Sequence, residues 1–297
     1  MAVFFKHVPN KGEYALEQEN RLPWVLVRGA GDLATGVIVR LHRCGFKVIA
    51  TESANPSAIR RRAALCEAVW QGTAQVEGVT CRRIECAEQA EATARAGEVP
   101  LLVDEHAACA ARLHPAAVVD AILAKRNLGT HCGMAPITIG LGPGFTAGQD
   151  VNAVVETMRG HHLGRVIRQG AAAPDTGVPG VIAGYADERV IHAPASGAMA
   201  FVTAETGQLL DIGALVRKGQ LIARVGDAPV YATIDGVLRG LIRAGYPVKK
   251  GLKIADIDPR PEQAAYCDTV SDKARAIGGG VVEALLEIAR EKGLRLL

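Results

Sequence analysis

The residues with the clearest chemical meaning lie in one glycine-rich stretch near the start of the chain. Gly29, Gly31 and Ala34 follow the apolar run Val25–Val27, and apolar residues at three- and four-residue spacing come after them. In a strand–turn–helix unit, the first glycine permits a tight turn, and the second lets a pyrophosphate approach the backbone at the helix N-terminus. A small third residue lets the helix pack closely on the strand. The stretch therefore predicts a unit that binds a dinucleotide.

An acidic residue stands where such a unit would hold a ribose hydroxyl. Gly45 suits the position just after a helix C-terminus, and a second strand is predicted from Lys47 to Thr51. Glu52 follows that strand directly, as the ribose-binding acid would. Asp32 belongs to the same predicted site because it lies in the turn itself. A glycine-rich turn without a nucleotide is the alternative interpretation.

A second glycine-rich run follows a later apolar strand. It contains Gly140, Gly142, Gly144 and Gly148, which are four glycines in nine residues. The main-chain amides of such a loop can surround an anion. If the two strands are parallel and close in the sheet, we expect this run to lie beside the first one. Gly140, Gly142 and Gly144 are therefore predicted to contribute to the same cofactor site.

Cys132 is the one cysteine that we nominate for chemistry. It lies next to His131 and ahead of a strand, and a neighbouring imidazolium would favour the reactive thiolate. Sequence neighbours in an extended segment point to opposite sides, so a buried structural cysteine is the favoured alternative. His161 and His162 are adjacent rather than at ligand spacing, so no metal site is predicted.

Two further groups of polar residues follow predicted strands. Asp104, Glu105 and His106 come after the apolar strand Pro100–Asp104, at the edge where open α/β sheets bind ligands. Three consecutive arginines, Arg60 to Arg62, enter a predicted helix and could meet phosphates beyond the second strand. They cannot share one helix face, so at most two would do so. A solvated basic turn is an equal alternative.

Composition limits the kinds of protein that this chain can be. Its 297 residues suffice for two domains, whose cores must be aliphatic because only 4% of residues are aromatic. A scattered formal charge of +3 does not favour nucleic-acid binding. No apolar run approaches the ~20 residues that span a bilayer, so no membrane contact is expected. Seven cysteines without a CxxC pair indicate reduced thiols in the cytoplasm.

We predict an α/β protein with four parts. Residues 1–22 form an arm, 23–183 a Rossmann-like domain with a parallel sheet, 184–260 a small all-β barrel-sandwich domain, and 261–297 a C-terminal helix. Ser271 is the predicted N-cap of that helix, which should dock on a domain through one apolar face. The residues of that face are Ile277, Val281, Leu285 and Ile288. Within the first domain, further strands are predicted at 79–84 and 116–125, and a helix at 87–96.

The predicted barrel contains an internal repeat. Leu215–Val225 and Pro247–Ile257 each place a valine, two basic residues and a glycine before an apolar strand. Two similar halves of short strands are typical of a pseudo-twofold flattened barrel, and the region resembles the biotinyl/lipoyl barrel-sandwich family. That family attaches its cofactor to a lysine in the hairpin between the halves. The corresponding turn, Gly226–Val230, contains no lysine, so we expect no carrier chemistry.

Three motifs together resemble the selenium-dependent molybdenum hydroxylase accessory family of the YqeB type, and more distantly XdhC-type proteins. They are Arg28–Gly36, Gly140–Asp150 and Gly251–Arg260. The resemblance implies a cytoplasmic maturation factor that acts on a molybdenum hydroxylase client. It carries over no catalytic residue.

The favoured function is binding and delivery of a cofactor. The Rossmann-like domain would hold an NAD-like dinucleotide or a molybdopterin-type cofactor, and the barrel would contact the client. Cys132, if reactive, would carry sulfur or selenium to the metal. The alternatives are an NAD-dependent oxidoreductase, with His106 or His131 as its acid or base, and a scaffold with a vestigial Rossmann domain. The sequence leaves open whether the chain forms a homo-oligomer.

Overall fold

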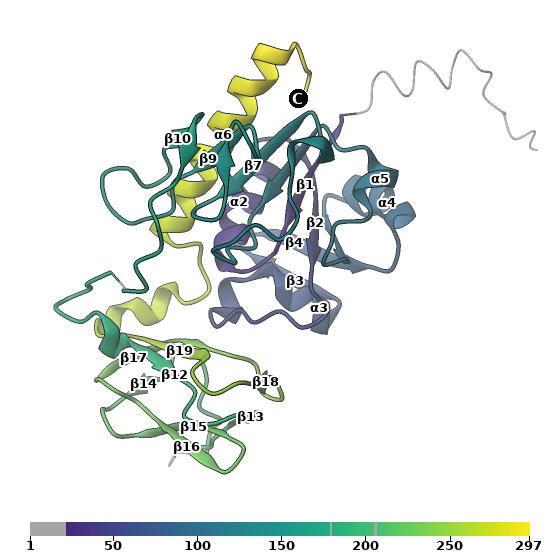
Figure 1. Ribbon diagram of the computed structural model, residues 1–297. Helices are drawn as coiled ribbons and strands as arrows, with labels where there is room; N and C mark the ends of the chain where they lie inside the picture. Colours follow the sequence, from purple (N-terminus) through teal and green to yellow (C-terminus); the bar gives the residue numbers. More distant parts are fainter. Residues whose placement is uncertain (1–21, 179, 205–206) are drawn as a thin grey trace, which may run out of the picture.

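The computed structural model describes residues 22–178, 180–204 and 207–297. These residues form a mixed α/β protein with a nine-stranded sheet, smaller antiparallel sheets and a long C-terminal helix (Figure 1). Residues 1–21 of the predicted N-terminal arm lie outside the described part. No helix of the described part is long and apolar enough to cross a membrane.

The large sheet is built around β1, and six of its eight strand pairings are parallel. In sheet order the strands are β10 (Val166–Ile167), β9 (Ala153–Val155), β7 (Ile137–Leu141), β6 (Ala117–Asp120), β1 (Trp24–Arg28), β2 (Lys47–Glu52), β5 (Val99–Val103), β4 (Val79–Ile84) and β3 (Thr73–Val76). The antiparallel pairs are at the two edges. The chain runs outward from β1 through β2 on one side and continues through β6 on the other. This reversal beside β1 is where open α/β sheets bind ligands.

Alternate residues of the buried strands serve the two faces of this sheet. Val25 and Val27 join the core under α2 (Asp32–Arg43) and α6 (Asp272–Lys292). Trp24 and Leu26 join a separate core with α4 (Ala90–Arg95) and α5 (Ala110–Leu113) on the opposite face. Burial on both faces explains why the run Val25–Val27 is apolar at every position.

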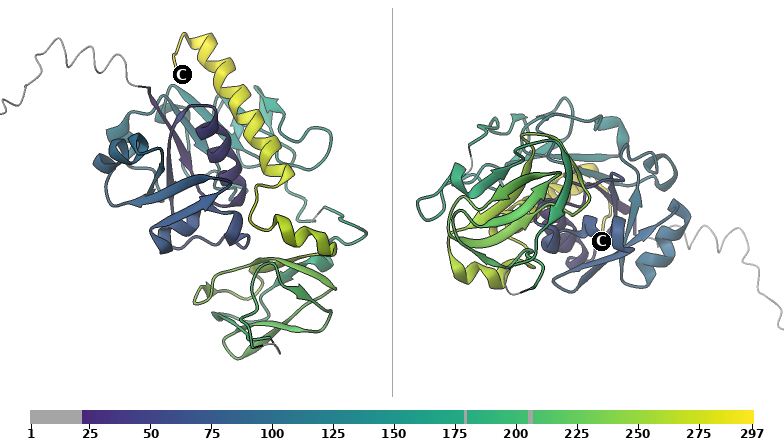
Figure 2. Two further views of the ribbon diagram at one scale, coloured as in Figure 1. Left: turned by 180° about the vertical axis from the view of Figure 1, so that it is seen from behind. Right: turned by 90° about the horizontal axis from the view of Figure 1, so that it is seen from below.

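Helix α6 confirms the prediction made from its apolar positions. Ser271 caps it, since the Ser271 Oγ accepts a hydrogen bond of 3.2 Å from the backbone N–H of Ala274. Ile277, Val281, Leu285 and Ile288 are all fully buried. The helix docks alongside α2, so the last part of the chain completes the core of the first (Figure 2).

Residues without side chains set the distance between α2 and α6. A Cβ on Gly36 would come within 2.6 Å of Ala274 Cβ, and one on Gly278 within 2.8 Å of the Gly36 carbonyl oxygen. Gly280 packs against the carbonyl oxygen of Gly164 in the same way. Glycine weakens a helix interior, but at positions 278 and 280 it is required because another backbone packs closely there. Gly279 has no neighbour within 4 Å of its Cβ position.

The remaining strands form two four-stranded antiparallel sheets and one two-stranded ribbon. The first comprises β12 (Val190–His192), β19 (Lys253–Asp258), β17 (Gly236–Leu241) and β14 (Leu215–Val216). The second comprises β16 (Ala228–Tyr231), β15 (Leu221–Val225), β13 (Gly197–Phe201) and β18 (Pro247–Val248). The ribbon pairs β11 (Gly170–Ala171) with β8 (Thr146–Ala147). The two larger sheets enclose a single hydrophobic cluster.

The internal repeat appears in the pairing of these strands. β13 of the first half pairs with β18 of the second, and β17 of the second half pairs with β14 of the first. The two repeat glycines, Gly219 and Gly251, have φ of +82° and +83°. Their backbone N–H groups make equivalent bonds, to the carbonyl oxygens of Ala232 and Ala193. Each half therefore contributes a strand that pairs with a strand of the other half.

One predicted strand is too long. The segment 116–125 was expected to be extended throughout, but β6 ends at Asp120. The Asp120 side chain ends it by accepting a hydrogen bond of 3.1 Å from the backbone N–H of Ile122, and Leu123 and Lys125 then adopt φ of +60°.

The helix predicted after Arg60 is likewise broken into short turns. The short helical elements outside the main helices are η1 (Arg61–Ala63), η2 (Leu65–Glu67), α3 (Ala68–Gln71), η3 (Ala87–Gln89), η4 (Cys132–Met134), η5 (Asp187–Arg189) and η6 (Pro261–Tyr266).

Neighbouring glycines of α6 provide a matched test of the packing against α2 and the sheet. Gly279→Ala should raise the free energy of unfolding by about 0.5–1 kcal/mol, because alanine favours the helix and its methyl group meets nothing. Gly280→Ala should lower it by about 1–3 kcal/mol, because the methyl group collides with the Gly164 carbonyl. Urea denaturation of both variants measures the difference. Equal shifts of the same sign would contradict the packing described.

Candidate functional site

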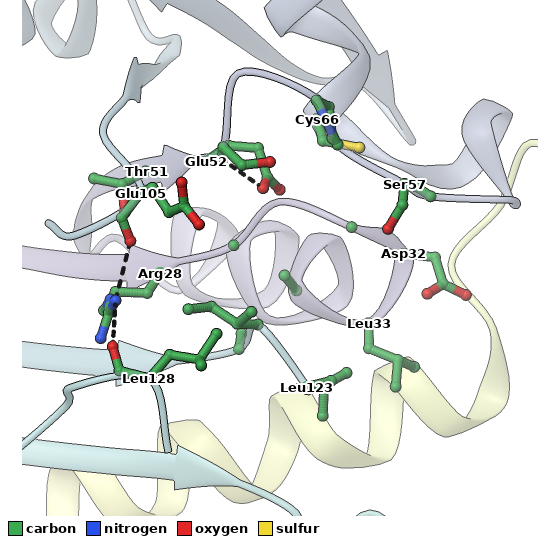
Figure 3. A pocket seen from close by; sticks show the side chains of 18 of the residues that line it. Arg28, Asp32, Leu33, Thr51, Glu52, Ser57, Cys66, Glu105, Leu123 and Leu128 are labelled. Atoms are coloured by element: carbon green, nitrogen blue, oxygen red, sulfur yellow. Dashed lines mark hydrogen bonds between the residues drawn. The ribbon is translucent and has the colours of Figure 1, made fainter. Parts of the chain in front are cut away.

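A cavity of about 350 Å³ opens at the carboxyl ends of β6, β1, β2 and β5. The glycine turn between β1 and α2 forms its floor, and segments that follow β2, β5 and β6 form its walls (Figure 3). Five of the predicted cofactor-binding residues line this glycine-loop cavity. They are Gly29, Gly31, Asp32, Ala34 and Glu52. The structure thus brings the first predicted group together, and its role in binding stays a prediction.

Gly29 and Gly31 of the turn lack a side chain for different reasons. Gly29 has φ of +95°, and a Cβ there would lie 3.0 Å from the Ala121 carbonyl oxygen, so the fold itself requires glycine. Gly31 has φ of −64° and ψ of −177°, which any residue can adopt. No atom lies within 4 Å of its Cβ position. Gly31 is the N-cap residue of α2, a position that favours glycine over apolar side chains, and neither its φ nor a neighbouring atom requires glycine. Its missing side chain keeps cavity space open.

Glu52 reaches back from the end of β2 to the glycine turn. Its Oε2 accepts a hydrogen bond of 2.8 Å from the backbone N–H of Ala30, and its Oε1 accepts one of 2.8 Å from that of Ser53. Burial raises the pKa of Glu52 above its ordinary value, and the negative charge of Glu105 adds to this, while the two amide hydrogen bonds act in the opposite direction. A carboxylate has about four lone-pair directions, so acceptor capacity remains on the cavity side.

Arg28 is a residue of the site that sequence reasoning missed. It is 2% exposed, and its guanidinium pairs with Asp120 at 3.4 Å and donates to the hydroxyl of Thr130. It also donates to the carbonyl oxygens of Glu105 and Leu128, at 3.0 and 3.3 Å. Arg28 therefore ties together two walls of the cavity. The available signal was a charged residue directly after a buried apolar strand.

The cavity has an excess of negative charge. Its lining carries four carboxylates, those of Asp32, Glu52, Asp104 and Glu105. Arg28 lines it too, but its charge is neutralised by Asp120 on the side away from the cavity. Such a surface attracts hydroxyl, amino and amide donors and repels phosphate groups. It therefore departs from the predicted role of the turn in holding a pyrophosphate.

Cys66 lies in the wall of the cavity and was not singled out from the sequence. Its backbone N–H donates to the Ala30 carbonyl oxygen at 2.8 Å, which fixes the segment after β2 against the glycine turn. Burial raises the pKa of the Cys66 thiol well above its ordinary value, and the carboxylates of Glu52 and Glu67 add to the effect. The thiol is therefore protonated at neutral pH and serves packing.

The second glycine run is not part of this cavity. The Cβ position of Gly140 is filled by the ring of Phe145, and that of Gly142 by the side chain of Thr157. Gly144 has φ of +111° and packs on the backbone of Arg126. Among the described residues, none of these three glycines lines the glycine-loop cavity. Close packing explains Gly140, Gly142 and Gly144, whereas Gly148 has φ of +86° and no atom within 4 Å of its Cβ position. The structure does not bring the three predicted glycines into the glycine-loop cavity, and their role in binding a cofactor stays a prediction.

The other predicted reactive residues also lie away from the cavity. Cys132 is exposed in η4, and its Sγ donates to the carbonyl oxygens of Gln149 and Asp150, the latter at 3.3 Å. His131 Nδ1 accepts a hydrogen bond from the backbone N–H of Gly133 and caps this turn. His106 is exposed beyond β5. Within the described chain, no histidine lines the cavity.

No protein-family model matches the chain. The curated uncharacterized protein YqeB of Escherichia coli (strain K12) is 49% identical over 267 residues. This similarity supports the resemblance of the chain to the YqeB family. It covers 90% of this chain and 48% of YqeB, so the chain spans about half the length of that relative. Because YqeB is itself uncharacterized, the similarity brings no activity with it.

A solved structure gives a weaker likeness. The product-bound ectoine utilization protein EutE (DoeB) from Ruegeria pomeroyi is 14% identical, and the match covers 79% of this chain and 84% of that one. The TM-score is 0.23, which is too low to support an argument about fold or function.

The surroundings of the seven free cysteines predict a pattern of alkylation. Cys44, Cys86 and Cys132 are exposed and should react with iodoacetamide in the folded protein, whereas Cys66 and Cys81 are fully buried and should react only on unfolding. Burial raises the pKa of Cys81 as well, so raising the pH from about 6.5 to about 8.5 should not expose either to reaction. Peptide mass spectrometry resolves each site.

The same experiment tests Cys132 as a carrier of sulfur or selenium. Since Cys132 is outside the cavity, we expect it to react no faster than Cys44 and Cys86 at about pH 6.5. Selective reaction of Cys132 at that pH would instead support a carrier role.

Proposed function

We propose that the chain is an accessory maturation factor for a molybdenum hydroxylase and binds a nucleotide or a molybdopterin-type cofactor in the glycine-loop cavity. The observation that carries the binding is Gly31. Its side-chain-free surface faces the cavity although its φ suits any residue and no neighbouring atom meets its Cβ position. A ligand that must approach the backbone at this point supplies the missing reason. In this interpretation the β1–α2–β2 unit is a Rossmann-type nucleotide unit, and the all-β region is a barrel-sandwich domain.

The chemistry of the lining suggests which part of the ligand the cavity takes. Glu52 stands at the end of β2, where a carboxylate accepts hydrogen bonds from ribose hydroxyls. Glu105 and Asp32 add acceptors from other sides of the cavity. A ribose offers hydroxyl donors, and a pterin ring offers amino and amide donors. Either would pair with these carboxylates, and a volume of about 350 Å³ suits one such group rather than a whole dinucleotide.

Delivery to a client enzyme gives the second domain a role. We propose that the all-β region contacts the molybdenum hydroxylase, while the large sheet holds the cofactor. The hairpin between β15 and β16 carries Gly226 and Asp227 at its turn and no lysine, which disfavours a swinging-arm carrier. The resemblance of the sequence motifs to the hydroxylase accessory family motivates this role.

A hydride-transferring oxidoreductase fits the cavity less well. Such an enzyme needs an acid or base beside the nicotinamide. The two histidines considered for it, His106 and His131, do not line the cavity in the described structure. A scaffold without a ligand leaves the open surface of Gly31 unexplained.

Identification of the ligand is the first test. The full chain, purified from its native host, should release a nucleotide or a pterin on denaturation, detected by mass spectrometry and by pterin fluorescence. Release of a pterin or nucleotide supports the proposal. Absence of any ligand, together with no binding of added nucleotides or molybdopterin by calorimetry, would reject it.

A substitution at Gly31 tests the position of the site. Gly31→Val should weaken binding of the identified ligand by at least about tenfold, because a side chain enters the space at the turn. The free energy of unfolding should fall by only about 1 kcal/mol, because valine is a poorer N-cap for α2 than glycine, whereas its Cβ meets no neighbouring atom and its φ suits any residue.

Gly279→Ala is the matched control for that measurement. It too adds a side chain at a glycine with open space, but on α6 and outside the cavity lining, so binding should be unchanged. Unaltered affinity of a folded Gly31→Val protein would place the ligand elsewhere.

A further inference from the structure

A second cavity lies at the junction of the large sheet and the all-β region. Its volume is about 320 Å³, and it is lined by four arginines from separate segments: Arg60, Arg159, Arg239 and Arg260. Asp272 is the one acidic residue of the lining. We call this cavity the arginine cleft. Its charge is opposite to that of the glycine-loop cavity.

Arg60 is buried in the wall of the cleft with hydrogen-bonding capacity unused. The residue is 6% exposed, and its Nε has no hydrogen-bond partner in the described part of the chain. Its Nη1 and Nη2 make only long contacts, each of 3.4 Å, with Asp32 Oδ2 and the Thr269 carbonyl oxygen. Burying such donors without full partners costs about 1–3 kcal/mol or more for a charged group. A bound acceptor in the cleft would offset that cost.

Arg239 also has N–H donors that are not fully hydrogen-bonded within the described residues. Its nearest carboxylate oxygens, on Asp258 and Asp256, are 3.7 and 3.8 Å away, beyond hydrogen-bond distance. Arg159 and Arg260 differ, because carboxylates hold them in place. Arg159 binds Asp272 at 2.7 and 3.1 Å, and Arg260 binds Asp258 at 2.9 Å through two nitrogens. The cleft therefore combines two anchored guanidiniums with two that are incompletely paired.

Helix α6 begins at the same place. Ser271 and Asp272, its cap and first residue, line the cleft, and the helix is 21 residues long. The N-terminal end of a helix carries partial positive charge, which favours anions, although here the Ser271 Oγ already accepts the Ala274 N–H. The helix end and the incompletely hydrogen-bonded guanidiniums of Arg60 and Arg239 therefore face the same cleft.

We propose that the arginine cleft binds a phosphate group of a small phosphorylated molecule. Guanidinium groups bind phosphate oxygens through paired hydrogen bonds, and Arg60 and Arg239 supply free donors from two sides. A volume of about 320 Å³ accommodates a pyrophosphate or a phosphate ester. This site does not depend on the function proposed for the glycine-loop cavity.

Calorimetry of the full chain at low salt tests the proposal, with inorganic pyrophosphate as the probe. Pyrophosphate should bind, and Arg239→Gln should weaken it by about 10- to 100-fold, because charged hydrogen bonds are lost. Arg239→Lys should restore part of the affinity by keeping the charge. Arg82→Gln is the control: Arg82 is exposed on β4, paired with Glu98 and outside the cleft, so its loss should leave binding unchanged.

Two further arms identify the source of the phosphate and separate this site from the glycine-loop cavity. If a nucleoside monophosphate binds more tightly than orthophosphate, the cleft takes a phosphate carried by a larger ligand. If the two bind equally, the cleft takes free phosphate. Either result supports a phosphate site in the arginine cleft. Gly31→Val should still bind pyrophosphate, even if it loses a cavity ligand. No binding of pyrophosphate, or equal weakening by Arg82→Gln and Arg239→Gln, would overturn the proposal.

Discussion

The approach of α6 to α2 is the contact on which the rest of the structure depends. The two helices meet where Gly36, Ala274 and Gly278 leave almost no side chain between the backbones. This closeness lets the apolar face of α6 complete the core beneath β1, so residues from the two ends of the described chain stabilise one sheet. Larger residues at these positions would push α6 outward and uncover that core. Gly278 of α6 and Gly36 of α2 thus make the short interhelical distance possible.

The position of α6 also fixes where the all-β region lies. The chain enters that region after β11 and returns through η6 to the start of α6, and both connections lie near the same edge of the sheet (Figure 1). The loop after β2 then docks on β17: the Ile59 carbonyl oxygen accepts a hydrogen bond of 2.7 Å from the Leu241 N–H, and Arg61 donates to the Leu241 carbonyl oxygen at 2.7 Å. This loop contributes to both cavities, since Pro56, Ser57 and Ala58 line the glycine-loop cavity and Arg60 lines the arginine cleft.

Local patterns in the sequence predicted much of this structure. The β1–α2–β2 unit, the cap at Ser271 and the apolar face of α6 depend on residues close in sequence, and the structure contains all three. What the sequence could not show depends on distant partners. Gly142 packs against Thr157 and Gly144 against the backbone of Arg126, and both partners lie outside the glycine-rich motif. Strand β6 stops early because Asp120 binds Arg28 and its own turn. The arginine cleft could not be predicted because its four arginines come from separate segments and meet only after the domains pack.

The ion pair between Asp32 and Arg60 links the two cavities physically. Asp32 lines the glycine-loop cavity and Arg60 lines the arginine cleft, with 3.4 Å between Oδ2 and Nη1. A phosphate bound to Arg60 would compete with Asp32 for the same guanidinium and leave that carboxylate freer to accept donors on its own side. Conversely, a donor-rich ligand that engaged Asp32 would free Arg60 for an anion. If both cavities bind ligands as proposed, occupancy of one would favour occupancy of the other through this shared ion pair.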